Sequence, residues 1–116
     1  MLEHHYLTTL FEPKSVAVIG ASERENSVGN VLFRNILDAG YKGRLYPINP
    51  GHETIQGVPA HKSIEEISAR VELAIVVTRP QTVPTIIEQC GRSGVKNVIV
   101  ITSGFAEAGH SGAALE

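Results

Sequence analysis

The residues best suited to bind a ligand lie between positions 16 and 29, where a short apolar run ends at Gly20 and a polar loop leads to Ser27. From Val28 onward apolar residues recur at helical spacing, so this stretch predicts a strand, a loop and a helix. Asn26 or Ser27 can cap the start of that helix. A helix N-terminus presents unpaired backbone N–H groups and a partial positive charge, and we therefore expect the loop to bind a phosphate-bearing ligand.

The spacing of this loop differs from that of the dinucleotide-binding fingerprint. A fingerprint that starts at Gly20 needs glycines at 22 and 25, where the chain has Ser22 and Glu25. An NAD site also needs an acid at the end of the second strand, a position that falls at or near Asn49. Both departures argue against NAD. A second interpretation stays open, in which Gly20 and Gly29 only permit tight packing of helix against strand.

Three further segments follow predicted strands, at residues 49–53, 78–80 and 102–105. In an open parallel sheet, ligands bind beyond the carboxyl ends of the strands. Arg79 is placed there to meet a phosphate, although surface exposure alone also explains an arginine. Thr102 and Ser103 offer hydroxyls suited to a ligand with amide groups such as pantetheine. Each segment can equally be a simple turn or strand exit.

Metal and nucleophile chemistry has little support in the sequence. The histidines show no helical pairing with a carboxylate and the chain has no cysteine cluster, so we expect no metal site. The single cysteine, Cys90, lies on an apolar helix face and is expected in the core rather than as a nucleophile. We therefore assign no catalytic residue.

The elements that must position these segments alternate between strand and helix. Strands are predicted at residues 15–19, 44–48, 73–78 and 98–102. One helix runs from Val28 to a stop at Gly40, a short helix opens at 63–66, and a third is capped by Thr82 and stops at Gly94. Three strands are continuously apolar, which is typical of strands covered on both faces. The pattern predicts a Rossmann-like α/β fold in three layers, an open parallel sheet with helices on both faces.

Composition limits the class of protein further. The 116 residues are 42% hydrophobic and 19% charged with a net charge of −2, which indicates one globular domain and no basic excess for nucleic acid or anionic membrane. The single cysteine, and a start without signal-peptide character, predict a cytoplasmic protein. The segment after 106 ends without a further strand, so we expect an N-terminal fragment of a longer chain that lacks the last strand of its sheet.

Four segments match one family in order: residues 10–22 (LFEPKSVAVIGAS), 46–50 (YPINP), 82–91 (TVPTIIEQCG) and 101–107 (ITSGFAE). They resemble the CoA-binding domain of NDP-forming (ADP-forming) acyl-CoA synthetases, including the synthetases fused to Gcn5-related acetyltransferases. The match is also similar to the N-terminal domain of the succinyl-CoA synthetase alpha subunit. It implies a Rossmann-like domain over residues 1–116 that binds CoA.

The resemblance implies that the first loop holds the CoA phosphates, that residues 49–52 lie against the nucleotide end, and that later strand ends line the pantetheine path. Relatives of the alpha-subunit type carry a lysine where His52 stands, so less positive charge is supplied there, and Arg24 would compensate. The implied CoA-binding residues are Gly20, Ala21, Ser22, Ser27, Val28, Gly29, Asn49, Pro50, His52, Val77, Thr78, Pro80, Ile101, Thr102 and Ser103.

The implied function is CoA or acyl-CoA binding within an acyl-CoA synthetase of the acetate–CoA ligase type, or within an acetyltransferase fusion. Such a parent makes acyl-CoA through an acyl phosphate and a phosphohistidine, with ATP and ADP bound elsewhere, and we expect no catalysis by this fragment. His110 does not match the phosphohistidine motif. Two alternatives remain at this point: an NAD(P)-binding oxidoreductase domain, and a Rossmann-like scaffold that binds no ligand.

Overall fold

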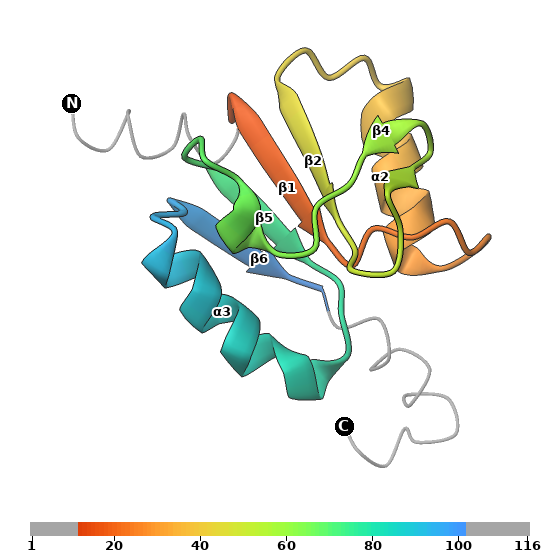
Figure 1. Cartoon of the computed structure of the whole chain (residues 1–116). Coiled ribbons are helices and arrows are strands. Elements are labelled where there is room, and N and C mark those ends of the chain that lie inside the picture. The colour runs from red at the N-terminus through yellow and green to blue at the C-terminus, as the bar shows by residue number, and fades with distance from the viewer. Residues whose placement is uncertain (1–11, 102–116) are drawn as a thin grey trace.

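The computed structural model describes residues 12–101, which form an open parallel sheet with helices packed on it (Figure 1). The sheet has four strands in the order β2-β1-β5-β6, and every neighbouring pair is parallel. Its strands are β1 (Ser15–Ile19), β2 (Arg44–Ile48), β5 (Leu73–Val76) and β6 (Asn97–Val100). The predicted bounds of β1 and β2 are confirmed, whereas β5 and β6 each end two residues earlier than predicted.

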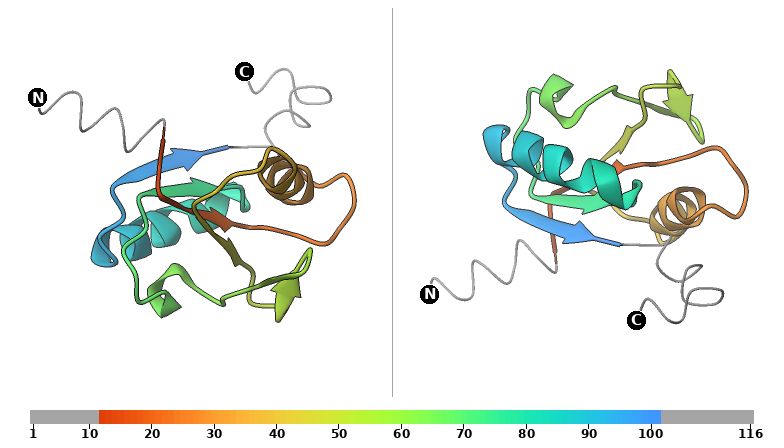
Figure 2. Two further views of the ribbon diagram at one scale, coloured as in Figure 1. Left: turned by 90° about the horizontal axis from the view of Figure 1, so that it is seen from above. Right: turned by 90° about the horizontal axis from the view of Figure 1, so that it is seen from below.

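Two helices cover opposite faces of this sheet (Figure 2). Helix α2 (Val28–Asp38) buries Phe33 against one face, and helix α3 (Val83–Arg92) buries Cys90 against the other. Successive strand residues point to opposite faces, so Val16 and Val18 join the α2 side while Ala17 and Ile19 join the α3 side. Because β1 is covered on both sides, all five of its residues are buried. The predicted three-layer α/β fold is confirmed.

The ends of α2 follow the sequence signals. The Ser27 hydroxyl accepts a hydrogen bond from the Asn30 N–H at 3.1 Å, which makes Ser27 the N-cap. Gly40 follows the helix with φ +77°, a left-handed conformation that glycine adopts without strain. Asn26 does not cap the helix but has φ +68° in the loop before it.

The start of α3 differs from the prediction. A 3₁₀ turn, η2 (Pro80–Thr82), precedes the helix, and the Thr82 side chain makes no capping hydrogen bond to it. The Thr82 hydroxyl instead lies 2.7 Å from the Arg79 carbonyl oxygen and 2.7 Å from the Thr78 hydroxyl. Thr82 thus occupies the predicted N-cap position of α3, but its hydroxyl bonds backward to the exit of β5 and does not cap the helix with a hydrogen bond.

The connection from β2 to β5 contains a hairpin that the sequence did not predict. Strands β3 (Thr54–Ile55) and β4 (Val58–Pro59) pair antiparallel around Gln56 and Gly57, which have φ +50° and +84°. Two consecutive positive φ values are typical of a tight type I′ turn. The predicted short helix after the hairpin is the 3₁₀ turn η1 (Ile64–Glu66). Ile55 of the hairpin is buried in the apolar cluster on the α2 side of the sheet. Ile64 of η1 is buried in the cluster on the α3 side.

Strand β6 is less covered than its apolar sequence suggests. Its partner among the described residues is β5 alone, and Ile99 and Val100 are 39% and 38% exposed. A continuously apolar run thus identifies β6 as a strand, but burial on both faces is reached only by β1 and β5. Within residues 12–101 no helix is long and apolar enough to cross a membrane.

Candidate ligand site

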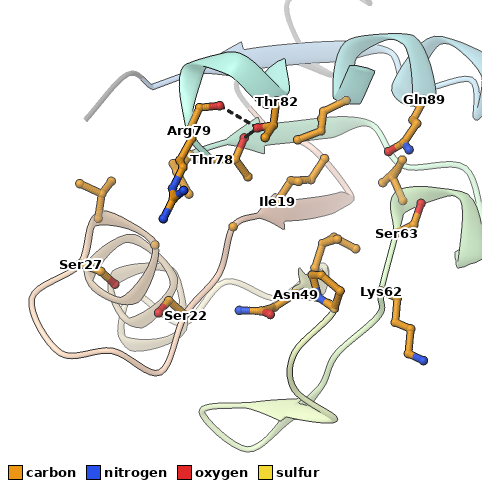
Figure 3. A pocket seen from close by; sticks show the side chains of 18 of the residues that line it. Ile19, Ser22, Ser27, Asn49, Lys62, Ser63, Thr78, Arg79, Thr82 and Gln89 are labelled. Carbon is orange, nitrogen blue, oxygen red and sulfur yellow. Dashed lines mark hydrogen bonds between the residues drawn. The ribbon is translucent and has the colours of Figure 1, made fainter. Parts of the chain in front are cut away.

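A cavity of about 500 Å³ opens at the carboxyl end of the sheet, at the point where the strand order reverses (Figure 3). The chain leaves β1 toward α2 on one face and leaves β5 toward α3 on the other, so the two exits diverge. A crevice at such a reversal is the usual ligand position in open α/β sheets. Its volume lies within the range of small-molecule sites.

The loop from β1 to α2 is closed by its own hydrogen bonds. The Ser22 hydroxyl accepts the Arg24 N–H at 2.9 Å, and the Ser27 hydroxyl donates to the Arg24 carbonyl at 2.8 Å while accepting the Asn30 N–H. The Asn30 amide donates to the Ser22 carbonyl at 3.0 Å. Because the Asn30 N–H is already bonded to the cap, the first-turn N–H groups that remain for a ligand are those of Val28 and Gly29.

Two glycines permit the close approach of α2 to β1. A Cβ on Gly29 would overlap the carbonyl oxygen of Gly20. Gly20 has φ +106°, and a Cβ there would lie 2.9 Å from a methyl carbon of Val77. Both glycines therefore permit tight packing of helix against strand, and because both also line the cavity, this packing brings bare backbone to its wall.

Asn49 joins the exit of β2 to the exit of β1. Its side-chain amide donates to the Ala21 carbonyl at 2.9 Å, and its side-chain oxygen accepts the Gly51 N–H at 2.8 Å. Asn49 occupies the region where an NAD site needs an acid, but here the side chain is a structural bridge. It also lines the cavity.

The exit of β5 provides the facing wall. Thr78, Arg79 and Thr82 line it, and the Arg79 side chain is exposed. Figure 3 shows Arg79 extending from the start of η2 toward the loop that carries Ser22 and Ser27. In the described part of the chain, the ion pairs are those of Arg92 with Glu65 and Glu88, so the Arg79 guanidinium carries an uncompensated charge.

The cavity wall is cationic. Arg24, Lys62 and Arg79 line it, and its described lining includes no aspartate or glutamate. None of the three makes an ion pair with another residue of 12–101. A cleft lined by one sign of charge concentrates ligands of the opposite sign, here against an overall net charge of −2. The wall is thus suited to a ligand with several negative charges.

The structure brings most of the predicted binding residues together, but not all of them. Ala21 is buried beneath the loop, and the exposed residues His52 and Pro80 lie outside the lining. Ile101 packs against the α2-side core, and Thr102 and Ser103 fall outside the described residues. The predicted residues that line the cavity are Gly20, Ser22, Ser27, Val28, Gly29, Asn49, Pro50, Val77 and Thr78.

Further lining residues were missed because they depend on tertiary contacts. Lys62 and Ser63 follow the unpredicted β3–β4 hairpin and lie at the cavity beside the end of β2, whereas Ile86 and Gln89 reach it from α3. Their spacing of three along a helix shows that the two share a face, which is the one signal the sequence offered. Nothing in the sequence marks that face as lining a cavity.

Neither metal nor thiol chemistry is evident at this site. In residues 12–101, no group of three or more histidine, cysteine, aspartate or glutamate side chains is arranged to hold a metal ion. Cys90 is 1% exposed in the α3-side core, and this burial raises the pKa of its thiol above the ordinary value. The expected core position of Cys90 is confirmed.

The fold and site define a Rossmann-like domain with a cationic cavity at its topological switch point. Residues 14–114 match the family model described as CoA binding domain, and the chain belongs to this family. The resemblance seen in the sequence motifs is thereby confirmed.

Two curated relatives of this chain are ADP-forming acetate–CoA ligases. An ADP-forming acetate–CoA ligase of Methanocaldococcus jannaschii is 42% identical over 98 residues, which cover 84% of this chain and 14% of the relative. The alpha subunit of the ADP-forming acetate–CoA ligase I of Pyrococcus furiosus is 42% identical over 114 residues, 95% of this chain and 25% of the subunit.

A solved structure shows the same likeness in three dimensions. The dinucleotide forming acetyl-coenzyme A synthetase 1 of Ca. Korarchaeum cryptofilum in its apo form superposes with a TM-score of 0.82 at 38% identity, over 89% of this chain and 22% of that one. The chain thus spans a quarter or less of the length of these relatives. An NAD-binding oxidoreductase domain is not favoured by these matches.

Proposed function

We propose that the cavity between the exits of β1 and β5 binds CoA or acyl-CoA. The observation that carries the proposal is the wall of the cavity. Three cations without ion-pair partners among residues 12–101 and the first turn of α2 surround about 500 Å³ in a chain of the CoA-binding family. CoA carries a diphosphate and a 3′-phosphate, and both helix N-termini and arginines bind such groups well.

The orientation of the ligand follows from the strand order. Asn49 and Pro50, at the end of β2, lie against the nucleotide end, and the first turn of α2 with Arg24 and Arg79 holds the diphosphate. Val77 and Thr78 then begin the pantetheine path, which continues along Ile101, Thr102 and Ser103. Ala21, His52 and Pro80 do not line the cavity, and their contact with CoA stays a prediction of the sequence.

Residues 1–116 are one domain of a longer acyl-CoA ligase in this proposal. Support comes from the lengths of the relatives, of which the chain covers 14% and 25%. The domain presents CoA to chemistry carried out elsewhere in the parent, where ATP and ADP bind, and catalyses nothing alone. The acyl group is acetate in the relatives compared above. A cytoplasmic location and a fusion to an acetyltransferase stay predictions of the sequence.

Calorimetric titration of the 116-residue chain tests the proposal. We expect CoA and acetyl-CoA to bind with one site per chain and NAD to release no binding heat. NAD binding without CoA binding would restore the oxidoreductase interpretation. Binding of none of the three would favour the ligand-free scaffold.

A further inference from the structure

Lys62 lines the cavity beside the exit of β2, on a fixed piece of backbone. The preceding residue, His61, pairs with Ile48 as an added parallel rung beside β2: its N–H donates to the Pro47 carbonyl at 2.9 Å and its carbonyl accepts the Asn49 N–H at 2.8 Å. The Lys62 N–H itself donates to the Glu66 carboxylate at 3.0 Å. The backbone of Lys62 is therefore anchored next to the exit of β2.

The side chain of Lys62, in contrast, is uncommitted. It is exposed, lines the cavity, and makes no hydrogen bond or ion pair with the rest of the described chain. Glu66 and Glu65 are the nearby acids in sequence, but Glu66 is engaged by the Lys62 N–H and Glu65 by Arg92 at 2.9 Å. The ammonium group keeps its charge available to a ligand.

His52 is a poorer candidate for the same task. It is exposed and lies outside the cavity lining. Lys62 is therefore the cation that this chain places beside Asn49 and Pro50.

We propose that Lys62 binds the 3′-phosphate of CoA and so makes the site select CoA over ligands that lack this group. The inference rests on the proposed function. Figure 3 shows Lys62 on the side of Asn49, and Arg79 on the side of Ser27. CoA has two separated anionic groups, and the 3′-phosphate is the one carried at the nucleoside end. The two cations thus match the two groups, with Arg79 at the diphosphate and Lys62 at the ribose phosphate.

The experiment compares CoA with dephospho-CoA, which lacks only the 3′-phosphate. Both ligands are titrated by calorimetry into the wild-type chain, Lys62→Gln, Lys62→Arg and the control Lys96→Gln at one ionic strength. Lys96 is exposed and does not line the cavity. We expect Lys62→Gln to weaken CoA binding about 10-fold or more, the usual size for a hydrogen bond to a charged group, and to leave dephospho-CoA binding within about twofold. Lys62→Arg and Lys96→Gln should keep the wild-type preference.

Equal weakening of both ligands by Lys62→Gln, or no weakening of either, would overturn the inference. So would a collapse of the preference in His52→Gln with Lys62→Gln unchanged, because the 3′-phosphate would then lie at His52. These outcomes leave CoA binding by the wild type intact. Failure of the wild type to bind CoA at all is a failure of the proposed function instead. Urea unfolding of each variant checks that it is folded.

Discussion

The two strand–loop–helix units that flank the cavity present different kinds of wall to it. In the β1–α2 unit the loop closes on itself through Ser22 and Ser27, and Gly29 brings backbone to the surface. In the β5–α3 unit the exit is a 3₁₀ turn without a side-chain cap, and Arg79 extends from it without an ion-pair partner in the described chain. The first unit contributes backbone N–H groups together with the side chain of Arg24, and the second contributes the side chain of Arg79 and no free helix N-terminus with a side-chain cap.

This difference separates general anion binding from selection of a particular anion. Backbone N–H groups at a helix N-terminus accept any phosphate of suitable size. Cationic side chains at fixed positions favour a ligand whose negative charges lie at matching positions. The β1–α2 unit should therefore determine whether the site exists, and the side chains of Arg79 and Lys62 should determine what it prefers.

Glycine substitutions in the two helices are expected to give the largest difference in stability between the two units. Gly29→Ala in α2 places a Cβ onto the Gly20 carbonyl, whereas a Cβ on Gly91 in α3 meets nothing within 4 Å. We expect Gly29→Ala to lower the free energy of unfolding by about 3 kcal/mol, because helix and strand must separate. Gly91→Ala should instead raise it by about 0.5–1 kcal/mol. Urea unfolding followed by circular dichroism measures both, and equal effects would show that α2 does not depend on close approach.

Replacing the free cation of the β5–α3 unit should affect binding without affecting the fold. We expect Arg79→Gln to weaken CoA and dephospho-CoA binding alike, by about 10- to 100-fold, since a charged hydrogen bond to the shared diphosphate is lost. The control is Arg34→Gln, because Arg34 is exposed on α2 and does not line the cavity. Calorimetry at low and high salt measures the change. Unchanged affinity in Arg79→Gln would remove the β5–α3 unit from the phosphate site.

Substitution of Asn49 shows whether the hydrogen bonds of this residue, at the end of β2, stabilise the β1–α2 loop. Asn49→Ala removes the bonds to the Ala21 carbonyl and from the Gly51 N–H, and we expect a loss of about 1–2 kcal/mol in the free energy of unfolding. Asn35→Ala serves as the control because Asn35 is exposed on α2. Denaturant midpoints of the two variants give the answer. Equal midpoints would mean that the bridge contributes nothing to stability.

The smallest expected effect concerns Cys90 under α3. Burial raises the pKa of its thiol in the folded state, so above a pH of about 8.5 the unfolded chain ionises first and loses the proton that the folded chain keeps. Stability should therefore fall as pH rises from 7 to 9.5, and this part of the fall should be absent in Cys90→Ala. Tyr41, whose pKa is also raised, is common to both chains and cancels in the difference. A stability difference between the two chains that does not change with pH would contradict the buried, neutral thiol.

The sequence was sufficient where local chemistry decides the structure. An apolar run ending at Gly20, a serine cap at Ser27 and a left-handed Gly40 are each readable from residue types, and they predicted β1 and α2 correctly. Lys62 and Gln89 could not be assigned in this way. Lys62 lies at the cavity beside the end of β2 and Gln89 reaches it from α3, and neither contact leaves a local pattern. At Thr82 the local pattern was misleading in a different way. Threonine is a good capping residue, but its hydroxyl here bonds backward to the Arg79 carbonyl at the exit of β5.

Amide NMR of the 15N-labelled chain during titration with CoA shows whether the β1–α2 and β5–α3 units bind one CoA molecule together. We expect the largest shifts at Val28 and Gly29 in the first turn of α2, at Arg79, and around Lys62, because these residues line a single cavity. The far ends of the strands, near Arg44 and Asn97, should shift little. Shifts confined to those far ends, or none at saturating CoA, would contradict the claim that the two units form one CoA site.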